Sequence, residues 1–374
     1  MPYTPNRYLH PLKIGSLELA NNLALAPMAG TTDATFRPIC HELGAGLVVT
    51  ELVSARGICY DTDLKRSWRY LEILPEAEKP VAIQLFGADP DDFYRAILRI
   101  HQHPVLAQYD LIDINMGCPV PKVVRGGEGS ALMKTPDVAA RVIESSVRAL
   151  QAVAGAGADI SAAGSSQVKP VTVKFRKGWD AQSVNAVEYA RVCESAGAAA
   201  MTVHARTRDQ YYSGKADWDI ITAVKAAVQV PVFGNGDLAS SADARRLIDQ
   251  TGADGLMVGR AALGNPWIFA ELLADLSRAE APSSSTMDHA PAPTPGSWHP
   301  PAPAEQAAMM RRHLRGLCQR LGEQTGVAEM RKQLAAYLRG TRQAAHWKNL
   351  AMQARTIAEV EIVLSGWLDF QIQD

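Results

Sequence analysis

Short apolar runs alternate with stretches of helical spacing along the first three quarters of the chain. Eight runs of three to six residues are rich in Val, Ile, Leu and Ala. The predicted inner strands are Leu23–Ala26, Gly46–Thr50, Pro80–Leu85, Tyr109–Ile112, Pro170–Lys174, Ala199–Val203, Pro231–Phe233 and Gly255–Val258. Strands that each precede a helical pattern indicate an α/β fold, a closed (β/α)8 TIM barrel. An open doubly wound sheet is the alternative, but it normally uses fewer strands.

The pattern changes after the eighth unit. Ala281–Pro303 contains seven prolines and four serines, a composition that cannot form a packed core. The chain beyond it is wholly helical in pattern, with one apolar stripe formed by Met330, Leu334, Tyr337 and Leu338. We therefore predict a catalytic barrel over residues 1–278, a Pro/Ser-rich linker over 279–303 and a small all-α domain over 304–374. Small residues near 154–168 predict a surface insertion.

Composition and charge narrow the class of protein. Hydrophobic residues make up 47% and charged residues 21% of the chain, as in ordinary globular proteins. Five cysteines without a Cys-x-x-Cys pair argue against disulfides and a zinc site, so we expect no metal. The chain starts without the pattern of a signal peptide and contains no apolar run of transmembrane length. We expect a cytoplasmic monomer that does not bind membranes.

The formal net charge of −1 gives no global sign of nucleic-acid binding. Between Glu305 and Arg355, however, ten Lys/Arg stand against three Asp/Glu. A solvated helix face is the ordinary explanation of such charges. A basic helical domain that follows a barrel enzyme favours a polyanionic partner instead.

The stretch Asp113–Pro119 follows the fourth strand and continues into a glycine-rich loop that contains Gly126, Gly127 and Gly129. Parallel α/β folds place their chemistry at the carboxyl ends of strands. A lone cysteine is usually a small buried hydrophobic residue. The polar, glycine-rich surroundings of Cys118 indicate a chemical role instead.

Other strand ends also carry polar groups, which should converge on the barrel mouth. They are the backbone of Pro27, Met28 and Ala29, the side chains of Gln84, Asn115, Lys174 and His204, and the loops Asn235-Gly236-Asp237 and Gly259-Arg260. The last two loops follow strands seven and eight, where such barrels bind phosphate through backbone N–H groups. FMN suits this set, because Gln84 offers a donor and an acceptor to its pyrimidine edge and Lys174 offers a cation. A resident nicotinamide dinucleotide suits it less, since no Gly-x-Gly-x-x-Gly opens a helix after a strand.

Six ordered motifs resemble the bacterial tRNA-dihydrouridine synthases, and the likeness runs from about Leu12 to Leu276. The motifs are Ala26–Asp33, Asp113–Pro119, Val173–Arg176, His204–Arg208, Gly234–Asp237 and Gly259–Trp267. Met330–Gly340 resembles the helical tRNA-binding domain of the family, most closely its B-type branch.

The resemblance implies reduction of FMN by NADPH, followed by reduction of the C5–C6 double bond of a uridine in the tRNA D-loop. Flavin N5 would give a hydride to C6, and Cys118 would give a proton to C5. The uridine would have to be flipped out of the folded RNA. Candidate tRNA contacts are Asn115, Arg176 and Arg206 at the barrel mouth, and Arg331 and Arg339 in the tail.

Other classes of protein account for parts of the sequence. A dihydroorotate dehydrogenase or an ene-reductase would explain the flavin site but not the basic tail. An aldolase would use Lys174 as a Schiff base, and a non-catalytic RNA-binding protein would have no need of Cys118.

Overall fold

The computed structural model describes residues 5–156, 167–278 and 298–373. The chain divides into two compact units, Met1–Gly259 and Arg260–Asp374. Most of the predicted linker over 279–303 and of the predicted insertion over 154–168 lies outside the described residues. No helix within the described ranges is both long and apolar enough to span a membrane.

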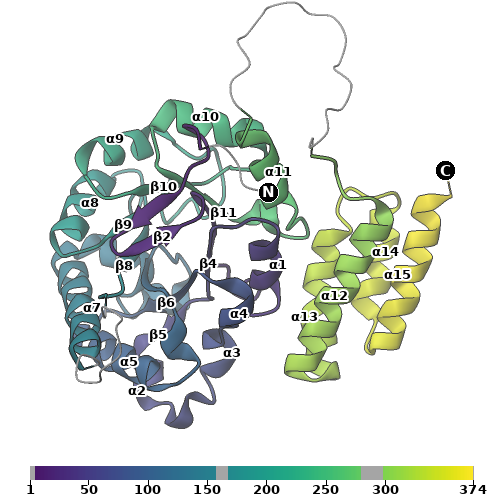
Figure 1. Ribbon diagram of the computed structural model, residues 1–374, viewed down its shortest axis with the longest axis horizontal. Helices are drawn as coiled ribbons and strands as arrows, with labels where there is room; N and C mark the ends of the chain where they lie inside the picture. The colour runs from purple at the N-terminus through teal and green to yellow at the C-terminus, as the bar shows by residue number, and fades with distance from the viewer. Residues whose placement is uncertain (1–4, 157–166, 279–297, 374) are drawn as a thin grey trace, which may run out of the picture. The chain divides into compact units, whose positions relative to one another are not determined.

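The first unit is a closed barrel of parallel strands (Figure 1). Its strands are β3 (Leu23–Leu25), β4 (Leu47–Val49), β6 (Val81–Phe86), β7 (Leu111–Met116), β8 (Val171–Arg176), β9 (Ala200–His204), β10 (Val232–Asn235) and β11 (Gly255–Val258). Each strand pairs in parallel with its neighbours, and the pairings β11–β3 and β4–β6 close the ring. All eight predicted strands, and with them the TIM barrel, are confirmed.

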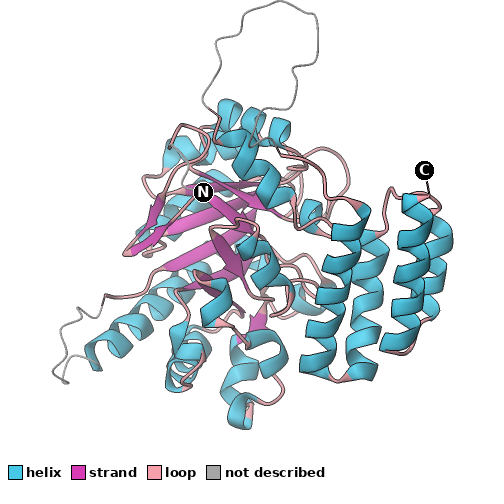
Figure 2. Ribbon diagram, turned by 45° about the vertical axis from the view of Figure 1, so that its right-hand side comes forward, coloured by secondary structure: helices cyan, strands magenta, loops and turns pink. Residues whose placement is uncertain are grey.

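Helices connect successive strands around the barrel (Figure 2). The longer ones are α1 (Phe36–Glu42), α5 (Pro90–Gln102), α7 (Pro136–Ala156), α8 (Ala186–Ser195), α9 (Asp219–Ala227) and α10 (Ser241–Thr251), and the shorter ones are α2 (Ala55–Tyr60), α3 (Trp68–Leu71), α4 (Pro75–Glu78) and α6 (Pro121–Val124). Their starts follow from local chemistry. The Asp89 carboxylate accepts a hydrogen bond from the backbone of Asp91, and the Ser240 hydroxyl accepts one from Asp243. α7 continues to Ala156, so residues 154–156, which were predicted to start the insertion, belong to this helix.

Three short strands were not predicted. An antiparallel hairpin, β1 (Leu12–Ile14) and β2 (Leu17–Leu19), packs apolar side chains against the core cluster. A third strand, β5 (Val53–Ser54), pairs with the end of β6. The fourth inner strand is also longer than predicted: β7 continues past Ile112 to Met116, and all six of its residues are buried. Asp113 and Asn115 therefore belong to the barrel wall and not to a loop.

The α-helices in the described part of the second unit are α11 (Ile268–Leu276), α12 (Pro303–Leu321), α13 (Glu323–Tyr337), α14 (Ala344–Gln353) and α15 (Ile357–Ile372). The predicted stripe of Met330, Leu334, Tyr337 and Leu338 is buried, as expected. The segment before α11 packs closely on α13. A Cβ atom at Gly264, whose φ is +69°, would lie 2.2 Å from the carbonyl carbon of Ala336. The rings of Trp267 and Tyr337 meet edge to face at 6.2 Å between centroids.

Candidate active site

The structure brings the polar side chains of the strand ends together at one mouth of the barrel. Gln84, Asn115, His204 and Asn235 are buried, and Lys174 is half-buried. Strand register places Asn115 beside Lys174 and Asn235 beside His204. Polar side chains in a barrel interior that is otherwise apolar need partners or a ligand. The predicted convergence of these residues is therefore observed.

A chain of hydrogen bonds links three of the strands. Gln84 donates from Nε2 to Oδ2 of Asp113 at 2.6 Å, and the Thr172 hydroxyl donates to Oδ1 at 2.6 Å. Asn115 donates from Nδ2 to Oε1 of Gln84 at 2.9 Å. Burial raises the pKa of the Asp113 carboxyl, and the hydrogen bonds from Gln84 and Thr172 oppose that shift. Asp113 was not predicted as a site residue.

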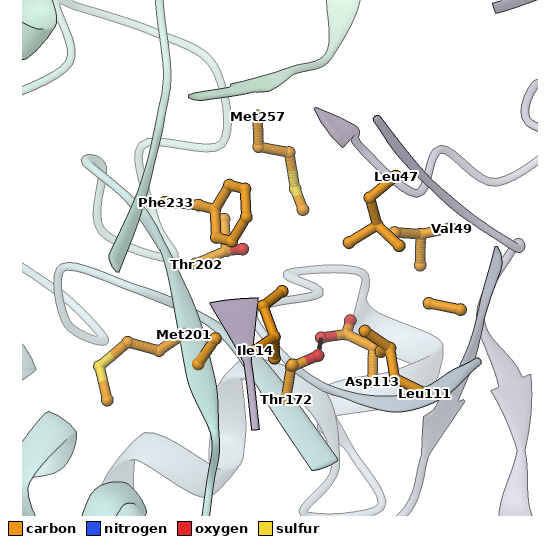
Figure 3. A pocket seen from close by; sticks show the side chains of 12 residues that line it. Ile14, Leu47, Val49, Leu111, Asp113, Thr172, Met201, Thr202, Phe233 and Met257 are labelled. Atoms are coloured by element: carbon orange, nitrogen blue, oxygen red, sulfur yellow. Dashed lines mark hydrogen bonds between the residues drawn. The ribbon is translucent and has the colours of Figure 1, made fainter. Parts of the chain in front are cut away.

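A small cavity lies one layer deeper in the barrel (Figure 3). Its volume is about 10 Å³, the size of one water molecule. Asp113, Thr172 and Thr202 line it together with apolar side chains such as Ile14 and Phe233. Figure 3 shows the carboxylate of Asp113 facing the hydroxyl of Thr172 in this layer. The polar layer at the mouth thus rests on a nearly filled core.

Lys174 places a cation at the mouth. Its Nζ donates to Oδ1 of Asn235 at 3.1 Å, and Asn235 donates from Nδ2 to the carbonyl of Met257 at 2.7 Å. The pKa of Lys174 is lowered to about 8, chiefly by burial and also by the charge of Arg176, while Asp113 opposes the shift. An ammonium has three N–H donors, and Lys174 makes one hydrogen bond to described residues. The remaining donors suit an acceptor on a bound ring.

Cys118 lies just beyond β7 and is half-buried. Oδ1 of Asn115 accepts from the backbone N–H groups of Gly117 at 3.2 Å and Cys118 at 2.9 Å. The carbonyl of Cys118 accepts from the N–H and the hydroxyl of Ser130. Gly129 has φ +60°, and a Cβ there would lie 2.9 Å from the Cys118 carbonyl oxygen, which explains this glycine. Burial raises the pKa of the thiol, so Cys118 is protonated at neutral pH.

Two arginines that we predicted as tRNA contacts hold loops together. Arg176 is 3% exposed and donates to the carbonyls of Gly117, Thr207 and Tyr211 at 2.7–3.0 Å. Arg206, 2% exposed, donates to the carbonyls of Ser213 and Gly214 and to both carboxylate oxygens of Asp237. These bonds tie the loop after β9 to the Cys118 loop and to the loop after β10.

The loop after β3 carries the predicted backbone contacts Pro27, Met28 and Ala29, and these three residues are partly or fully exposed. Arg37 supports this loop from inside by donating to the carbonyl of Thr32 at 2.7 Å. The Thr32 hydroxyl in turn accepts from the Met28 N–H at 2.9 Å.

Arg37 also pairs with Glu78 at 2.8 and 3.0 Å and donates to the Glu72 carbonyl at 2.6 Å. Arg37 is 1% exposed and Glu78 is fully buried. This support was not predicted, because its partners lie far apart in the sequence.

Of the two predicted phosphate loops, the one after β10 bends at Gly236 and Asp237, whereas in the other Arg260 begins a short 3-10 helix. Gly236 has φ +119° and accepts from the Trp218 indole at its carbonyl, and Asp237 has φ +54°. The Asp237 carboxylate is engaged by Arg206 and by the Ala216 N–H at 2.7 Å. An ionised carboxylate is a poor phosphate ligand, so Asp237 contributes here by shaping the turn. Gly259 closes the first unit and Arg260 opens the second.

The two arginines predicted in the tail differ in their surroundings. Arg331 is half-buried and donates from Nε to the carbonyl of Ala354 at 2.9 Å. Arg339 lies just after α13 and is exposed. Of the two, Arg339 is the one whose side chain is exposed.

Comparison with known proteins decides the family. The model of the dihydrouridine synthase (Dus) family matches residues 24–371. A protein of Rickettsia conorii named probable tRNA-dihydrouridine synthase is 36% identical over 337 residues, covering 90% of each chain. This chain belongs to the dihydrouridine synthase family. A Pseudomonas aeruginosa protein named tRNA-dihydrouridine synthase B is 38% identical over 328 residues, covering 87% of this chain and 86% of that one.

The B-type branch is supported further by a Serratia marcescens protein of the same name, 41% identical over 262 residues and covering 70% of this chain and 71% of that one. Among solved structures, histamine dehydrogenase from Rhizobium superposes with a TM-score of 0.51 at 16% identity, over 70% of this chain and 47% of that one. At that identity the superposition bears on the barrel fold alone.

Proposed function

We propose that this chain reduces the C5–C6 double bond of a D-loop uridine in tRNA, with FMN as resident cofactor and NADPH as reductant. Membership of the family supports the reaction class. The observation that carries the cofactor assignment is Lys174, a half-buried ammonium with a pKa of about 8 and donors left for a ligand. An electron-rich ring at the barrel mouth would accept these donors and favour the charged lysine.

The surrounding residues suit a flat ring that carries amide edges. Gln84 on β6 and Asn115 on β7 carry side-chain amides, and His204 adds an imidazole from β9. The backbone of Pro27–Ala29 would contact the ring from the first loop. The turns at Asn235–Asp237 and Gly259–Arg260 would offer backbone N–H groups to the phosphate. Bound FMN would supply the hydride that is added to uracil C6.

Cys118 would give the proton to uracil C5 from the opposite face. A general acid must carry its proton at working pH, and burial keeps this thiol protonated. The hydrogen bonds from Gly117 and Cys118 to Asn115 fix the loop at its start. Arg176 braces the same loop through the Gly117 carbonyl. The thiol is thereby positioned on an element that is rigid at its base.

We propose that residues 304–374 form the tRNA-binding domain, that residues 1–278 carry the catalytic barrel and that 279–303 is the linker in the sequence; residues 260–278 pack in the same unit as the tail helices. The excess of Lys/Arg between Glu305 and Arg355 supports this role. Arg339 is the exposed candidate for a phosphate contact. In this scheme Asn115 contacts the uridine, whereas Arg176 and Arg206 shape the mouth that receives it.

The test uses the purified full-length protein and tRNA from a strain that lacks its own dihydrouridine synthases. We expect flavin bands in the absorbance spectrum, bleaching by NADPH, and reoxidation that requires tRNA and yields dihydrouridine. Flavin that is reoxidised equally well by free pyrimidines or simple enones would contradict the tRNA substrate. A colourless protein that does not take up added FMN would contradict the cofactor.

A further inference from the structure

A second pocket lies on the barrel rim, outside the polar ring at the mouth. Its volume is about 370 Å³, more than a nucleobase needs, and it lies between β5, α2 and the segment that leads into α3. Its lining includes Ser54, Tyr60, Arg66, Ser67, Tyr70 and Phe86. Nothing in the proposed reaction uses these residues.

The lining combines aromatic faces with a cation. Tyr60 is 70% exposed and Tyr70 is 39% exposed, so both rings are accessible to a ligand. Arg66 is also exposed. The acid in the wall, Asp61, accepts from the backbone N–H groups of Arg66 at 3.2 Å and Ser67 at 2.6 Å, so its carboxylate is already engaged. From Ala55 to Leu71, four Lys/Arg stand against two Asp.

The wall of this pocket is fixed by the rest of the fold. Arg99 on α5 donates to the carbonyls of Cys59 and Asp61, both at 2.7 Å. Strand pairing places Ser54 beside Phe86. Because this wall is already ordered, little conformational entropy is lost when a ligand binds to it.

The pocket also adjoins the candidate active site. Phe86 lies two residues beyond Gln84 on β6, so both side chains leave the strand on the same face. Arg56 on α2 acts electrostatically on Glu128 in the loop of Cys118. A polymer that enters the mouth would therefore pass this pocket.

We propose that this rim pocket binds an unpaired nucleotide of the tRNA next to the uridine that is reduced. Its base would stack on Tyr60 and Tyr70, and its phosphate would contact Arg66. When a uridine is extruded from the RNA, the neighbouring base loses its stacking on that uridine. Stacking on the rings of Tyr60 and Tyr70 would replace this lost interaction. The inference rests on the proposed function, because it takes tRNA as the substrate.

The test compares matched exposed variants of the full-length protein by tRNA binding over a salt series. Loss of one stacked base typically weakens binding about 5- to 150-fold, so Tyr60→Ala should bind tRNA about tenfold more weakly, and Tyr60→Phe should bind like wild type. Arg66→Gln should weaken binding and lower the salt slope by about one. Lys65→Gln is the charge control, because Lys65 pairs with Asp63 at 3.7 Å and lies outside the pocket.

Unchanged tRNA affinity in Tyr60→Ala and Arg66→Gln would overturn the rim pocket. An increase in the KM for NADPH with unchanged tRNA affinity would also overturn it, since the pocket would then hold the reductant. Wild-type protein that binds tRNA but forms no dihydrouridine would contradict the proposed reaction and leave the binding comparison valid.

A separate observation concerns Asp113. Side-chain amides can be reversed end for end, because oxygen and NH2 have similar shapes. The carboxyl oxygen that faces Gln84 accepts a hydrogen bond, so Gln84 must turn its NH2 group toward Asp113. Oε1 of Gln84 then faces Asn115, whose NH2 group must point toward it. Oδ1 of Asn115 is left to accept from Gly117 and Cys118.

We infer that Asp113 is a positioning residue, which sets the direction of the amide chain and through it the Cys118 loop. With an amide at position 113 the chain could run in either direction. In the reversed direction the NH2 group of Asn115 would face the N–H groups of Gly117 and Cys118, donor against donor. The loop would then lose its attachment to β7. This inference, too, rests on the proposed function for its kinetic readout, but its structural readout is independent of it.

Two variants are compared. Asp113→Asn keeps the shape of the side chain but replaces the carboxylate with an amide. Thr172→Val removes the hydrogen bond from the Thr172 hydroxyl to Asp113 but keeps the direction of the hydrogen bonds through Gln84 and Asn115. Asp113→Asn should speed amide exchange at Gly117 and Cys118 and slow tRNA-dependent flavin reoxidation at least tenfold, with unchanged KM for tRNA. Thr172→Val should change either quantity less than threefold. In the double variant Asp113→Asn with Gln84→Glu, the carboxylate at position 84 can only accept hydrogen bonds, so the side-chain amides again have a single orientation. This variant should recover the protection of the Gly117 and Cys118 amides from exchange.

Wild-type exchange at both amides in Asp113→Asn would overturn the positioning role. Equal losses of rate in Asp113→Asn and Thr172→Val would do so as well, since they would indicate general destabilisation. If the wild type shows no tRNA-dependent reoxidation, the proposed function fails and the exchange data still decide the role of Asp113.

Discussion

Removal of the Glu78 carboxylate should destabilise the barrel strongly. Glu78→Ala leaves the Arg37 guanidinium, 1% exposed, without its charged partner. Arg37 would keep its bonds to the carbonyls of Thr32 and Glu72 and lose both bonds to Glu78. Breaking a buried ion pair from one side costs about 3–5 kcal/mol. The midpoint of thermal unfolding should fall by roughly 6–20 °C.

Differential scanning calorimetry on the flavin-free protein measures this effect, and two controls define its cause. Arg37→Met combined with Glu78→Leu removes both charges and should recover most of the loss, because apolar pairs often replace buried ion pairs at no cost. Arg141→Ala removes one side of an exposed pair, at 3.0 Å to Asp137, and should cost about 0.5 kcal/mol. A Glu78→Ala midpoint within 2 °C of wild type would refute the reasoning.

Four further predictions concern the proposed reaction. Cys118→Ala should leave flavin content and oxidation of NADPH intact and slow dihydrouridine formation about 10²- to 10⁴-fold; wild-type rates would exclude the thiol as the acid. Lys174 loses its proton as pH rises through about 8, so the Kd for FMN should rise above that pH in wild type but not in Lys174→Met, as a fluorescence titration would show. Removal of Pro303–Asp374 should abolish most tRNA affinity in a binding assay while flavin remains bound. Replacing both Arg331 and Arg339 with alanine should lower the salt slope of tRNA binding by roughly one, the value for a single phosphate contact. Only Arg339 is expected to make that contact, because Arg331 already donates to the carbonyl of Ala354. An unchanged slope would mean that Arg339 contacts solvent and not tRNA.

The barrel could be predicted because parallel inner strands are buried on both faces and therefore appear as apolar runs. The hairpin of β1 and β2 has strands of three residues, and β5 has two, which is too short for any periodic signal. The end of β7 was missed for a different reason. Asp113 and Asn115 are polar, and only the amide chain inside the barrel makes their burial favourable.

The candidate site was predictable where side-chain chemistry shows in the sequence, as at Gln84, Lys174 and Cys118. It was not predictable where side chains bond to backbone carbonyls, because a carbonyl leaves no mark in the sequence. Arg176 and Arg206 have the residue type of phosphate contacts, yet five backbone carbonyls accept half of their ten N–H donors.

The close packing of Gly264 against α13 should hold the protein together even after its backbone is cut. The residues before α11 and the helices after Pro303 share one packed unit, and Trp267 is 8% exposed within it. A protease cut between Leu276 and Pro303 should therefore leave two fragments that copurify and separate only in denaturant. Any side chain larger than hydrogen at position 264 would loosen that association, because it would collide with the backbone of Ala336. Two fragments expressed separately should then reassemble with wild-type Gly264 and fail to do so with Gly264→Val.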